Sequence, residues 1–572
     1  MSEDFEVVGT NAAAPFTLKV HRGDGMALLA MNWREGQPPG DFVGFGIEYK
    51  EPDVDRYWAL QNRLSFPGPG GAVDPNENST LRAPIQKFRW VHFPFHAELP
   101  GTFTYRVTPV FMNNAGVLSY GDAQEVGIEL RRETYPGELN VAFTRGFVSS
   151  QAFVDRYEQY APIATLLPAT PDDGLTFVPT HPKAQDAYTW MGFEARGAIL
   201  DLLDAAIADA QAQVRVVAYD LNLPEIVDRL RQLGSRLRII IDDSGSHKPD
   251  TSAESQAAAI LAGTDVGAEV KRQHVGHLQH NKTIVVNGPT LQTAVCGSTN
   301  MSWRGFYVQA NSAVVIRGQD AIQPFAAAFD NYWDHGTPNE FAVTPSAERT
   351  PLGLAGIDAQ VAFSPHSPAN AQLDAVAADI SANTSSSLLY SLAFLYQTPG
   401  VIQDAIRKVM DDPNLFVYGI SDRKVGGLEV QTPDGNVAPV YPSQLTGRNA
   451  PEPFKSEPTG GSGVRMHHKF VVIDFDKPTA RVYLGSYNFS IAADTQNGEN
   501  LVLISDRRIA VSYAVEALSL FDHYEFRVLQ NDANSAKTKL DLQLPPRNPG
   551  DTPWWSEDYT DPRKIRDREL FS

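Results

Sequence analysis

Short runs in which apolar and polar residues partly alternate fill the first 145 residues of the chain. Phe103, Tyr105 and Val107, for example, follow one another at a spacing of two. That spacing places side chains on one face of a β-strand. Clusters of Gly, Pro, Asn and Asp separate the runs, which is typical of turns between strands. The pattern predicts an all-β sandwich over residues 1–145.

From about residue 160 the pattern changes to helices alternating with continuous apolar strands. Residues 191–211 have helical periodicity, and 214–221 form an apolar strand. Residues 224–234 begin with Pro and end with Gly, as helices often do, and lead into a second apolar strand at 237–243. Strand, helix and strand in this order, with both strands apolar throughout, predict a parallel α/β layer.

The same order returns later in the chain. Helical patterns at 373–383 and 401–410 alternate with apolar runs at 387–396 and 415–421. The period of this duplication is roughly 190 residues, which is too long for a solenoid repeat and indicates two similar domains packed together. The fold class expected is therefore α/β, with two tandem halves of one architecture preceded by the β-sandwich.

The domain organisation follows from these changes in pattern. The tail is rich in Pro and charge, so we expect it to lie along the surface, with Trp554 and Trp555 as candidate anchors. The N-terminal domain loosely resembles immunoglobulin or fibronectin type III modules, a likeness that implies no chemistry. The boundaries predicted are 1–145 for the sandwich, 160–340 and 355–535 for the two α/β halves, and 536–572 for the tail.

Composition narrows the class of protein. Hydrophobic residues make up 42% of the chain and charged residues 20%, which is normal for a globular protein with a sizeable core. No apolar run reaches the ~18 residues of a membrane span. Cys296 is the single cysteine, so a disulfide framework is excluded and a cysteine-based zinc site nearly so. Together with the absence of a signal-peptide pattern, these features lead us to expect a cytoplasmic protein.

The net charge bears on the substrate. Lys and Arg number 48 against 68 Asp and Glu, a formal charge of −20. Such a field repels polyanions and anionic membranes at long range. A nuclease would therefore need a locally basic groove, and a lipase would fit zwitterionic lipids better than acidic ones.

Two copies of one motif set stand at matching places in the duplicated halves. Each has a His-x-Lys followed 17 or 18 residues after its His by Gly-Ser-x-Asn-x-Ser. After Asn300 and Asn488 the copies align without a gap as far as Ile316 and Ile504. The first copy comprises HNKTIVVN (280–287), GSTNMS (297–302) and QANSAVVI (309–316), and the second HHKFVVID (467–474), GSYNFS (485–490) and NGENLVLI (497–504).

These segments resemble the paired H-x-K-x4-D motifs of the phospholipase D superfamily, and most closely its bacterial endonuclease and cardiolipin-synthase branch. The resemblance covers about 175–530. It implies two α/β/α halves related by a pseudo-twofold axis through one active site, so that dimerisation is not needed to complete the site. It also implies a phosphodiester substrate and a phosphohistidine intermediate.

The residue types fit that chemistry independently. On an extended strand, positions i and i+2 share a face, so His280 projects with Lys282 and His467 with Lys469. One histidine can attack phosphorus while the other protonates the leaving oxygen and later activates water. The lysines, with the amides of Asn300 and Asn488, can hold the phosphoryl oxygens. No metal or other cofactor is expected, because the lysines supply the positive charge. The hydroxyl groups of Ser302 and Ser490 are further candidate donors.

The two copies differ at two positions. Asn287 and Asn311 in the first copy correspond to Asp474 and Glu499 in the second. In the superfamily, the acid at the Glu499 position orients a catalytic histidine, which we take to be the one in the opposite half. We therefore predict that Glu499 supports His280 as the nucleophile. Asp474 follows an apolar strand and is expected to be a structural turn acceptor.

His467 would then be the general acid, paired at best with the neutral Asn311. A carboxylate on an imidazole N–H stabilises the imidazolium, and an amide does so far less.

His274, His277 and His280 have a spacing of three, which does not align side chains on a strand, so a metal site there is disfavoured. Trp303, which directly follows the first Gly-Ser-x-Asn-x-Ser motif, is expected to be buried rather than to stack on substrate.

The sequence leaves three functions open. A nuclease is slightly favoured, because the second copy is most like the endonuclease branch. A phospholipase D, or a transferase of phosphatidyl groups, is the main alternative. The third is a binding or assembly protein that keeps the fold without turnover, a reading motivated by Asn287 and Asn311.

Overall fold

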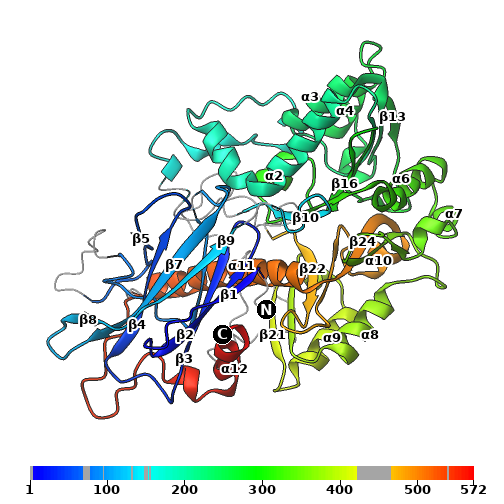
Figure 1. Cartoon of the computed structure of the whole chain (residues 1–572). Coiled ribbons are helices and arrows are strands. Elements are labelled where there is room, and N and C mark those ends of the chain that lie inside the picture. Colours follow the sequence, from blue (N-terminus) through cyan, green and yellow to red (C-terminus); the bar gives the residue numbers. More distant parts are fainter. Residues whose placement is uncertain are drawn as a thin grey trace.

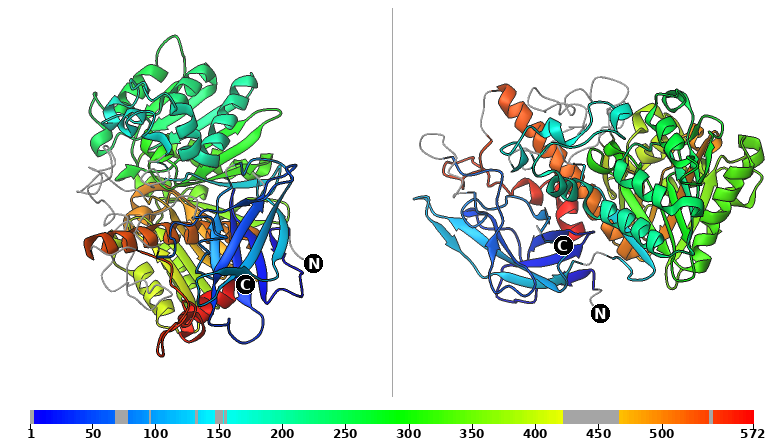
Figure 2. Two further views of the ribbon diagram at one scale, coloured as in Figure 1. Left: turned by 90° about the vertical axis from the view of Figure 1, so that its left-hand side faces the viewer. Right: turned by 90° about the horizontal axis from the view of Figure 1, so that it is seen from above.

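A computed structural model describes residues 4–67, 78–94, 96–130, 133–146, 153, 156–421, 466–536 and 540–572, without the side chains of 524–536. In this part of the chain, four β-sheets and their surrounding helices form a mixed α/β molecule (Figure 1). Figure 2 shows the N-terminal strands in blue at one end and the green α/β region at the other, with the orange helix α11 running between them.

Two antiparallel sheets are built from the N-terminal residues. Both contribute to one apolar core, in which Leu18 and Leu29 of one sheet and Phe45 and Val107 of the other are fully buried. The first sheet has the order β1 (Glu6–Val8), β2 (Phe16–Arg22), β3 (Ala27–Trp33) and β6 (Arg89–His92). The second has the order β5 (Trp58–Ala59), β4 (Phe42–Lys50), β7 (Thr102–Met112) and β8 (Leu118–Tyr120), with β9 (Gln124–Glu129) also pairing with β7.

Strand β10 (Leu139–Phe143) corrects the predicted boundary at residue 145. It pairs with β17 (Ser312–Arg317) in the first α/β sheet rather than with the N-terminal strands. All five of its residues are buried, as a strand covered on both faces requires. Its sequence resembles the strands before it, so the change of sheet is visible only in the pairing.

The first α/β sheet has seven strands. Their order is β10, β17, β16 (Gln292–Gly297), β15 (Thr283–Asn287), β11 (Gln213–Ala218), β12 (Leu237–Ile241) and β13 (Glu269–Arg272). The helices of this region are α2 (Ala184–Ala208), α3 (Pro224–Leu233), α4 (Ala253–Leu261), α5 (Trp303–Tyr307), α6 (Gln319–Asp334) and α7 (Pro338–Phe341).

The second α/β sheet repeats this order. It runs β18 (Thr350–Pro351), β19 (Asp358–Ser364), β24 (Asn497–Ser505), β23 (Arg481–Gly485), β22 (Lys469–Ile473), β20 (Ser387–Leu392) and β21 (Phe416–Ile420). Its helices are α8 (Leu373–Asn383), α9 (Val401–Met410), α10 (Ile491–Thr495) and α11 (Arg507–Ala536). Strand β10 occupies the place in the first sheet that β19 occupies in the second, which explains why it does not pair with the N-terminal strands.

The expectation of a parallel layer is only partly right. β11 pairs in parallel with β12, and β20 with β21, because a helix connects the two strands of each pair. The strands that follow the motifs are antiparallel instead. In the first sheet, for example, β15 and β16 are joined by the four residues between Asn287 and Gln292, which is too short for a parallel crossover.

Helices cover both faces of each α/β sheet. Helices α2, α3 and α4 pack on one face of the first sheet, and α8 and α9 on one face of the second. Helices α6 and α11 lie on the other faces and share one continuous core with strands of both sheets. The two sheets are therefore held against each other by a common apolar interior.

The C-terminal residues are more deeply packed than their composition suggests. Trp555 is buried in the core of the N-terminal sheets, and the Nε1–H of Trp554 donates to the carbonyl oxygen of Phe42. Helix α12 (Pro562–Phe571) ends in Phe571, which is fully buried. The expected anchoring by Trp554 and Trp555 is thus confirmed, and the burial of Phe571 is an anchor that the sequence did not predict. No helix within the described ranges is both long and apolar enough to cross a membrane.

Candidate active site

Each His-x-Lys segment is positioned by backbone pairing with a segment of the other α/β region. Strand β14 (Leu278–Gln279) pairs in parallel with β24, so that Gln279 lies opposite Gly498. His280 and Glu499, the next residues of the two strands, are thereby brought together. In the same way Met466 forms a parallel bridge with Ala310, which brings the following residues, His467 and Asn311, side by side.

His280 is held by a carboxylate. Its Nδ1 lies 2.9 Å and 2.8 Å from Oε1 and Oε2 of Glu499, a side chain that is fully buried. A carboxylate accepts a hydrogen bond and has none to give, so Nδ1 carries the hydrogen and Nε2 is left with a lone pair. Burial lowers the pKa of His280, and the charge of Glu499 opposes that shift only in part.

His467 is held by an amide. Its Nδ1 lies 2.7 Å from Oδ1 of Asn311, whose own Nδ2 donates to the carbonyl oxygen of Gly305 at 2.9 Å. That second bond fixes which end of the amide faces the ring, so Nδ1 of His467 is also the protonated nitrogen. Burial, followed by the charges of Lys469 and Lys282, lowers the pKa of His467 well below its usual value.

The two lysines lie next to the histidines of their own segments. The Nζ of Lys282 donates to the carbonyl oxygen of His280, and that of Lys469 to the carbonyl oxygen of His467 at 2.8 Å. His280 lies three residues before the start of β15 and His467 two residues before the start of β22, rather than within these strands as the same-face argument assumed. Burial lowers the pKa of Lys282 to about 8.

The residues of the two Gly-Ser-x-Asn-x-Ser motifs have distinct roles. Nδ2 of Asn300 donates to Oδ2 of Asp220 at 2.7 Å, and the buried Oδ1 atoms of Asn300 and Asn488 have no partner among the described residues. Ser302 and Ser490, predicted as hydroxyl donors, accept hydrogen bonds as the N-caps of α5 and α10. Their oxygens satisfy helix N–H groups, which is a structural role.

Asp474 and Asn287 lie away from these groups. Asp474 accepts hydrogen bonds from the backbone N–H groups of residues 385, 386 and 387, at distances of 2.8 to 3.1 Å, and from the hydroxyl of Ser385. This is the turn-acceptor arrangement expected for it. Asn287 ends β15 and pairs through its backbone with Gln213 and Gln292.

The two histidines face one cavity of about 1120 Å³, which lies between the two α/β sheets. Their ring centroids are 6.5 Å apart. The first half contributes Tyr219, Asp220, Asn222, His247, Glu254, Asn300, Ser302 and Arg304 to the lining, and the second half Leu373, Asp374, Phe394, Val401, Ile402, Asn488, Phe489, Ser490 and Ile491. Neither lysine is among the lining residues.

A third histidine in the cavity wall was missed in the sequence. Nε2 of His247 lies 3.3 Å from Oδ1 of Asp220, and Nδ1 lies 2.8 Å from Oδ2 of Asp242. Burial acts to lower the pKa of His247, but these two hydrogen bonds outweigh it and raise the pKa to about 10. Asp220 and Asp242 follow the parallel strands β11 and β12, and carboxyl ends of parallel strands are a known signal for binding sites. His247 has no such signal.

The histidines of the H-x2-H-x2-H pattern do not gather at one point. Nδ1 of His274 forms an ion pair with Oδ1 of Asp243 at 2.6 Å, whereas His280 faces the cavity. Trp303 is buried, and its Nε1–H donates to the carbonyl oxygen of Gly174. Both observations agree with the sequence interpretation.

Comparison with known families finds one matching family model. The model is described as "Cardiolipin synthase, PLD-like domain" and matches residues 203–333 and 445–520. Two similar curated proteins are named phospholipase D, from Rickettsia prowazekii (strain Madrid E) and Rickettsia typhi (strain ATCC VR-144 / Wilmington). Each is 47% identical over 47 residues, 8% of this chain and 21% of the relative. The match thus spans about a fifth of those relatives.

Solved structures with similarity include a phospholipase D family member, Nuc, from Salmonella typhimurium. It is 24% identical, with 25% of this chain and 88% of Nuc covered and a TM-score of 0.21. Phosphatidylserine synthase of Haemophilus influenzae Rd KW20 is 15% identical, with 59% of this chain and 85% of that chain covered and a TM-score of 0.38.

Proposed function

The chain belongs to the phospholipase D superfamily, and on that premise we propose that it is a phosphodiesterase acting through a phosphohistidine intermediate. The supporting observation is the meeting of His280 and His467 on one cavity, with ring centroids 6.5 Å apart. An attacking nitrogen stands ~3–3.5 Å from phosphorus. The other histidine must come within ~2.6–3.2 Å of the leaving oxygen, which is bonded to the same phosphorus. Both rings therefore have to face one cavity at short range, as these two do.

The proposal includes the architecture of the site. The two α/β sheets, with matching strand orders, are tandem phospholipase-D-like halves related by a pseudo-twofold axis that passes between His280 and His467. Both half-sites come from one chain, so a second copy is not required to complete the active site.

In the first step, Nε2 of His280 attacks the phosphorus of the diester. The N–P bond forms as the P–O bond to the leaving alcohol breaks, and Nε2–H of His467 donates its proton to the leaving oxygen. Glu499 stabilises the positive charge that develops on the His280 ring through the Nδ1 hydrogen bond of 2.8 Å. Asn311 gives His467 the correct tautomer without adding charge.

In the second step, neutral His467 takes a proton from water and the water oxygen attacks phosphorus. The P–N bond breaks, His280 is regenerated as a neutral ring, and a phosphomonoester is released. An alcohol in place of water would give transfer by the same chemistry. Lys282 and Lys469 supply positive charge for the phosphoryl oxygens, so these two steps do not require a metal ion.

The lining of the cavity favours a phospholipid over a nucleic acid. The carboxyl side chains of Asp172, Asp220, Glu254, Asp374 and Asp494 line it. They would repel the successive phosphates of a polynucleotide, whereas a zwitterionic headgroup tolerates or gains from them. On the second-half wall, Val401 and Ile491 are 39% and 69% exposed, as a contact with acyl chains would require.

A nuclease is the second candidate. It rests on the likeness of the second motif copy to the endonuclease branch and on Arg304, a cation in the cavity lining. If the protein is a nuclease, the cavity carboxylates would line the rim of the cavity, and Arg304 would line the path of the nucleic acid backbone.

A parallel assay separates these candidates. Wild-type protein and the H280A variant are incubated in EDTA with phosphatidylcholine vesicles, plasmid DNA and RNA. We expect the release of choline and phosphatidic acid by the wild type alone, with both nucleic acids intact. Cleavage of DNA or RNA without lipid turnover would replace the lipid assignment with the nuclease. Absence of turnover on all three, with tungstate still bound, would favour a binding protein instead.

A further inference from the structure

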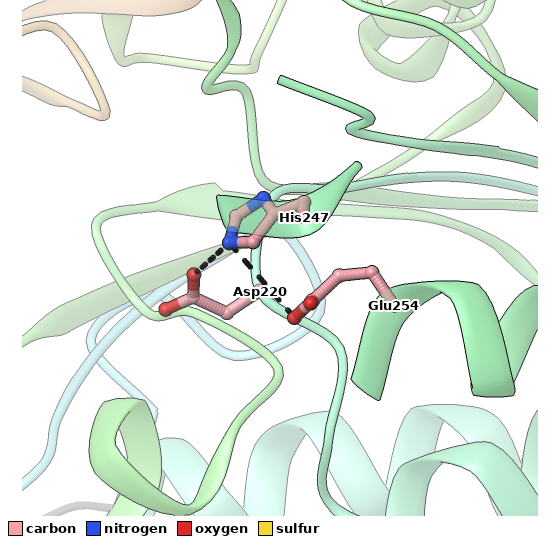
Figure 3. Close-up of side chains that lie close together, drawn as sticks. All are labelled: Asp220, His247 and Glu254. Atoms are coloured by element: carbon pink, nitrogen blue, oxygen red, sulfur yellow. Dashed lines mark ion pairs between the residues drawn. The ribbon is translucent and has the colours of Figure 1, made fainter. Parts of the chain in front are cut away.

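Three ionisable side chains meet in the wall of the cavity, next to the catalytic groups. Figure 3 shows Asp220, His247 and Glu254 pointing toward one another from three separate elements. Asp220 follows β11, His247 ends the short helix η5 (Gly245–His247), and Glu254 lies in the first turn of α4. Nε2 of His247 lies 3.3 Å from Oδ1 of Asp220 and 4.0 Å from Oε1 of Glu254.

The other nitrogen of His247 is fixed by a buried carboxylate. Nδ1 lies 2.8 Å from Oδ2 of Asp242, a fully buried side chain that also accepts the backbone N–H of Gln279 at 2.7 Å. Metal-binding histidines almost always donate their second N–H to a carboxylate or carbonyl in this way, which orients the first nitrogen toward the ion. The Nε2 of His247 is oriented by the same means toward the two carboxylates.

Carboxylates outnumber imidazoles around His247. Three carboxylates, from Asp220, Asp242 and Glu254, face one imidazole, which carries at most a single positive charge, and the charges of Lys282 and Arg304 act on Asp220 as well. A divalent cation in place of the His247 proton would add one further positive charge to the group.

We propose that Asp220, His247 and Glu254 bind one divalent transition-metal cation, with zinc as the best match, at the wall of the active-site cavity. Zinc–ligand distances of ~2.0–2.1 Å place ligand atoms ~3.3 Å apart on the edge of a tetrahedron. The 3.3 Å between His247 and Asp220 already has that value, and the 4.0 Å between His247 and Glu254 would have to shorten by under ~1 Å. A nitrogen with two carboxylate oxygens suits zinc and manganese rather than calcium or magnesium.

The cation would stand beside the phosphate rather than on it. The ring of Tyr219 lies between the two sites, with centroid distances of 4.6 Å to His247 and 4.7 Å to His280. Asn300, whose Nδ2 bonds to Asp220, connects the cation to the catalytic motif. The fourth position of the ion would face the cavity and accept an anionic oxygen of the bound substrate. The phosphohistidine steps proceed without it, so this inference stands apart from the proposed function.

Zinc binding by the chelator-treated full-length protein tests the proposal. Isothermal titration should give one equivalent of Zn²⁺ for the wild type and at least a tenfold weaker affinity for H247A and E254Q. The glutamine of E254Q keeps an acceptor for the backbone N–H of Leu221, which Glu254 now bonds at 3.1 Å, so that variant is expected to fold.

Two matched variants test where on the protein the zinc ion binds. H274A removes a second histidine paired with an aspartate, 2.6 Å from Asp243 but outside the cavity lining, and should leave zinc affinity unchanged. H467A removes a cavity histidine that is not part of the proposed site, and should also retain the ion. Loss of zinc in H467A but not in H247A would place the ion between the catalytic histidines and overturn the proposal. Absence of stoichiometric binding by the wild type would overturn it equally.

Discussion

The carboxylate of Glu499 lies 2.8 Å from Nδ1 of His280, although the two residues are 219 positions apart in the chain. The contact depends on the pairing of β14 with β24, which places the two residues next to each other at the end of the ladder. The corresponding contact of His467 is with an amide, Asn311. The two otherwise similar half-sites therefore differ by one charge, and this difference assigns distinct roles to the histidines.

Replacing Glu499 by Gln should slow the first chemical step. The glutamine amide can turn its NH2 toward Nδ1, which favours the wrong tautomer of His280 and removes the charge that stabilises the imidazolium. We expect kcat to fall by roughly 10²–10⁴-fold, with the fold retained by circular dichroism. N311A, which removes the neutral partner of His467, serves as the matched variant and should cost less. Equal losses in both variants would contradict the asymmetry.

The phosphorylated histidine can be identified with an activated substrate. A p-nitrophenyl phosphodiester has a leaving group that needs no general acid, so H467N should release one equivalent of nitrophenol in a burst and then stall. The stall is expected because water is no longer activated by His467. H280N should show no burst, and labelled phosphate should be recovered on His280. A burst from H280N, with the label on His467, would reverse the two roles.

The pH dependence of kcat/KM should be centred on the acidic side of neutrality. His467 must be protonated to act as the acid, and burial together with the two lysines lowers its pKa in the empty site. Its protonated form is thus present below this lowered pKa and is lost as the pH rises through it. Neutral His280 is required as well, and its pKa is also lowered. The profile of kcat/KM against pH should be bell-shaped, and both of its apparent pKa values should lie below about 6.5, the ordinary pKa of histidine.

An added carboxylate tests the cause of this pH profile. In N311D the new side chain would face Nδ1 of His467 and favour the imidazolium, so the pKa of His467 should rise. The kcat/KM profile should then move upward in pH or gain in height, because a larger fraction of the protein carries a proton on His467 while His280 is neutral. A profile that neither moves upward nor gains in height would show that His467 is not the acid.

Asp474 should matter for stability rather than for chemistry. D474A would leave three backbone N–H groups, of residues 385–387, without their acceptor. A loss of ~2–6 kcal/mol is expected, because the N–H groups of the buried residues Ser386 and Ser387 each cost ~1–3 kcal/mol when unpaired. D474N keeps one acceptor and tolerates the positive φ of 53° at this position, so it should cost less. N287A, at the corresponding position of the first copy, should be within ~0.5 kcal/mol of the wild type. Thermal denaturation of the three variants measures the order of their stabilities.

Much of the α/β region could be predicted because its signals are local. The helices at 373–383 and 401–410, and the strand that follows each of them, are indicated by the apolar pattern of a short stretch of sequence. The two motif copies identified His280 and His467 in the same way. The meeting of each histidine with the opposite half came from the resemblance, since no local pattern contains it.

Other features could not be predicted because they depend on long-range pairing. The sequence of β10 is similar to those of the N-terminal strands before it. Only its hydrogen-bonded pairing with β17 assigns it to the first α/β sheet. His247 lies in a three-residue helix without periodicity, and its importance arises from Asp220 and Asp242 at the ends of two neighbouring strands. Phe571 is buried by residues hundreds of positions away, which composition alone does not reveal.

The exposed apolar wall of the cavity allows a direct test of the lipid assignment. Ile491 is 69% exposed and lines the cavity, so an acyl chain that enters there would contact it. I491D should reduce turnover of phosphatidylcholine vesicles by at least tenfold, because desolvating the new carboxylate against a chain is unfavourable. Turnover of a soluble p-nitrophenyl phosphodiester, which has no acyl chain, should change less than twofold. Val343 is 80% exposed and absent from the cavity lining, so V343D controls for the added charge and should leave both activities unchanged. Equal losses on both substrates in I491D would mean that the wall supports the catalytic groups instead of the lipid, and would return the choice of substrate to the nucleic acid.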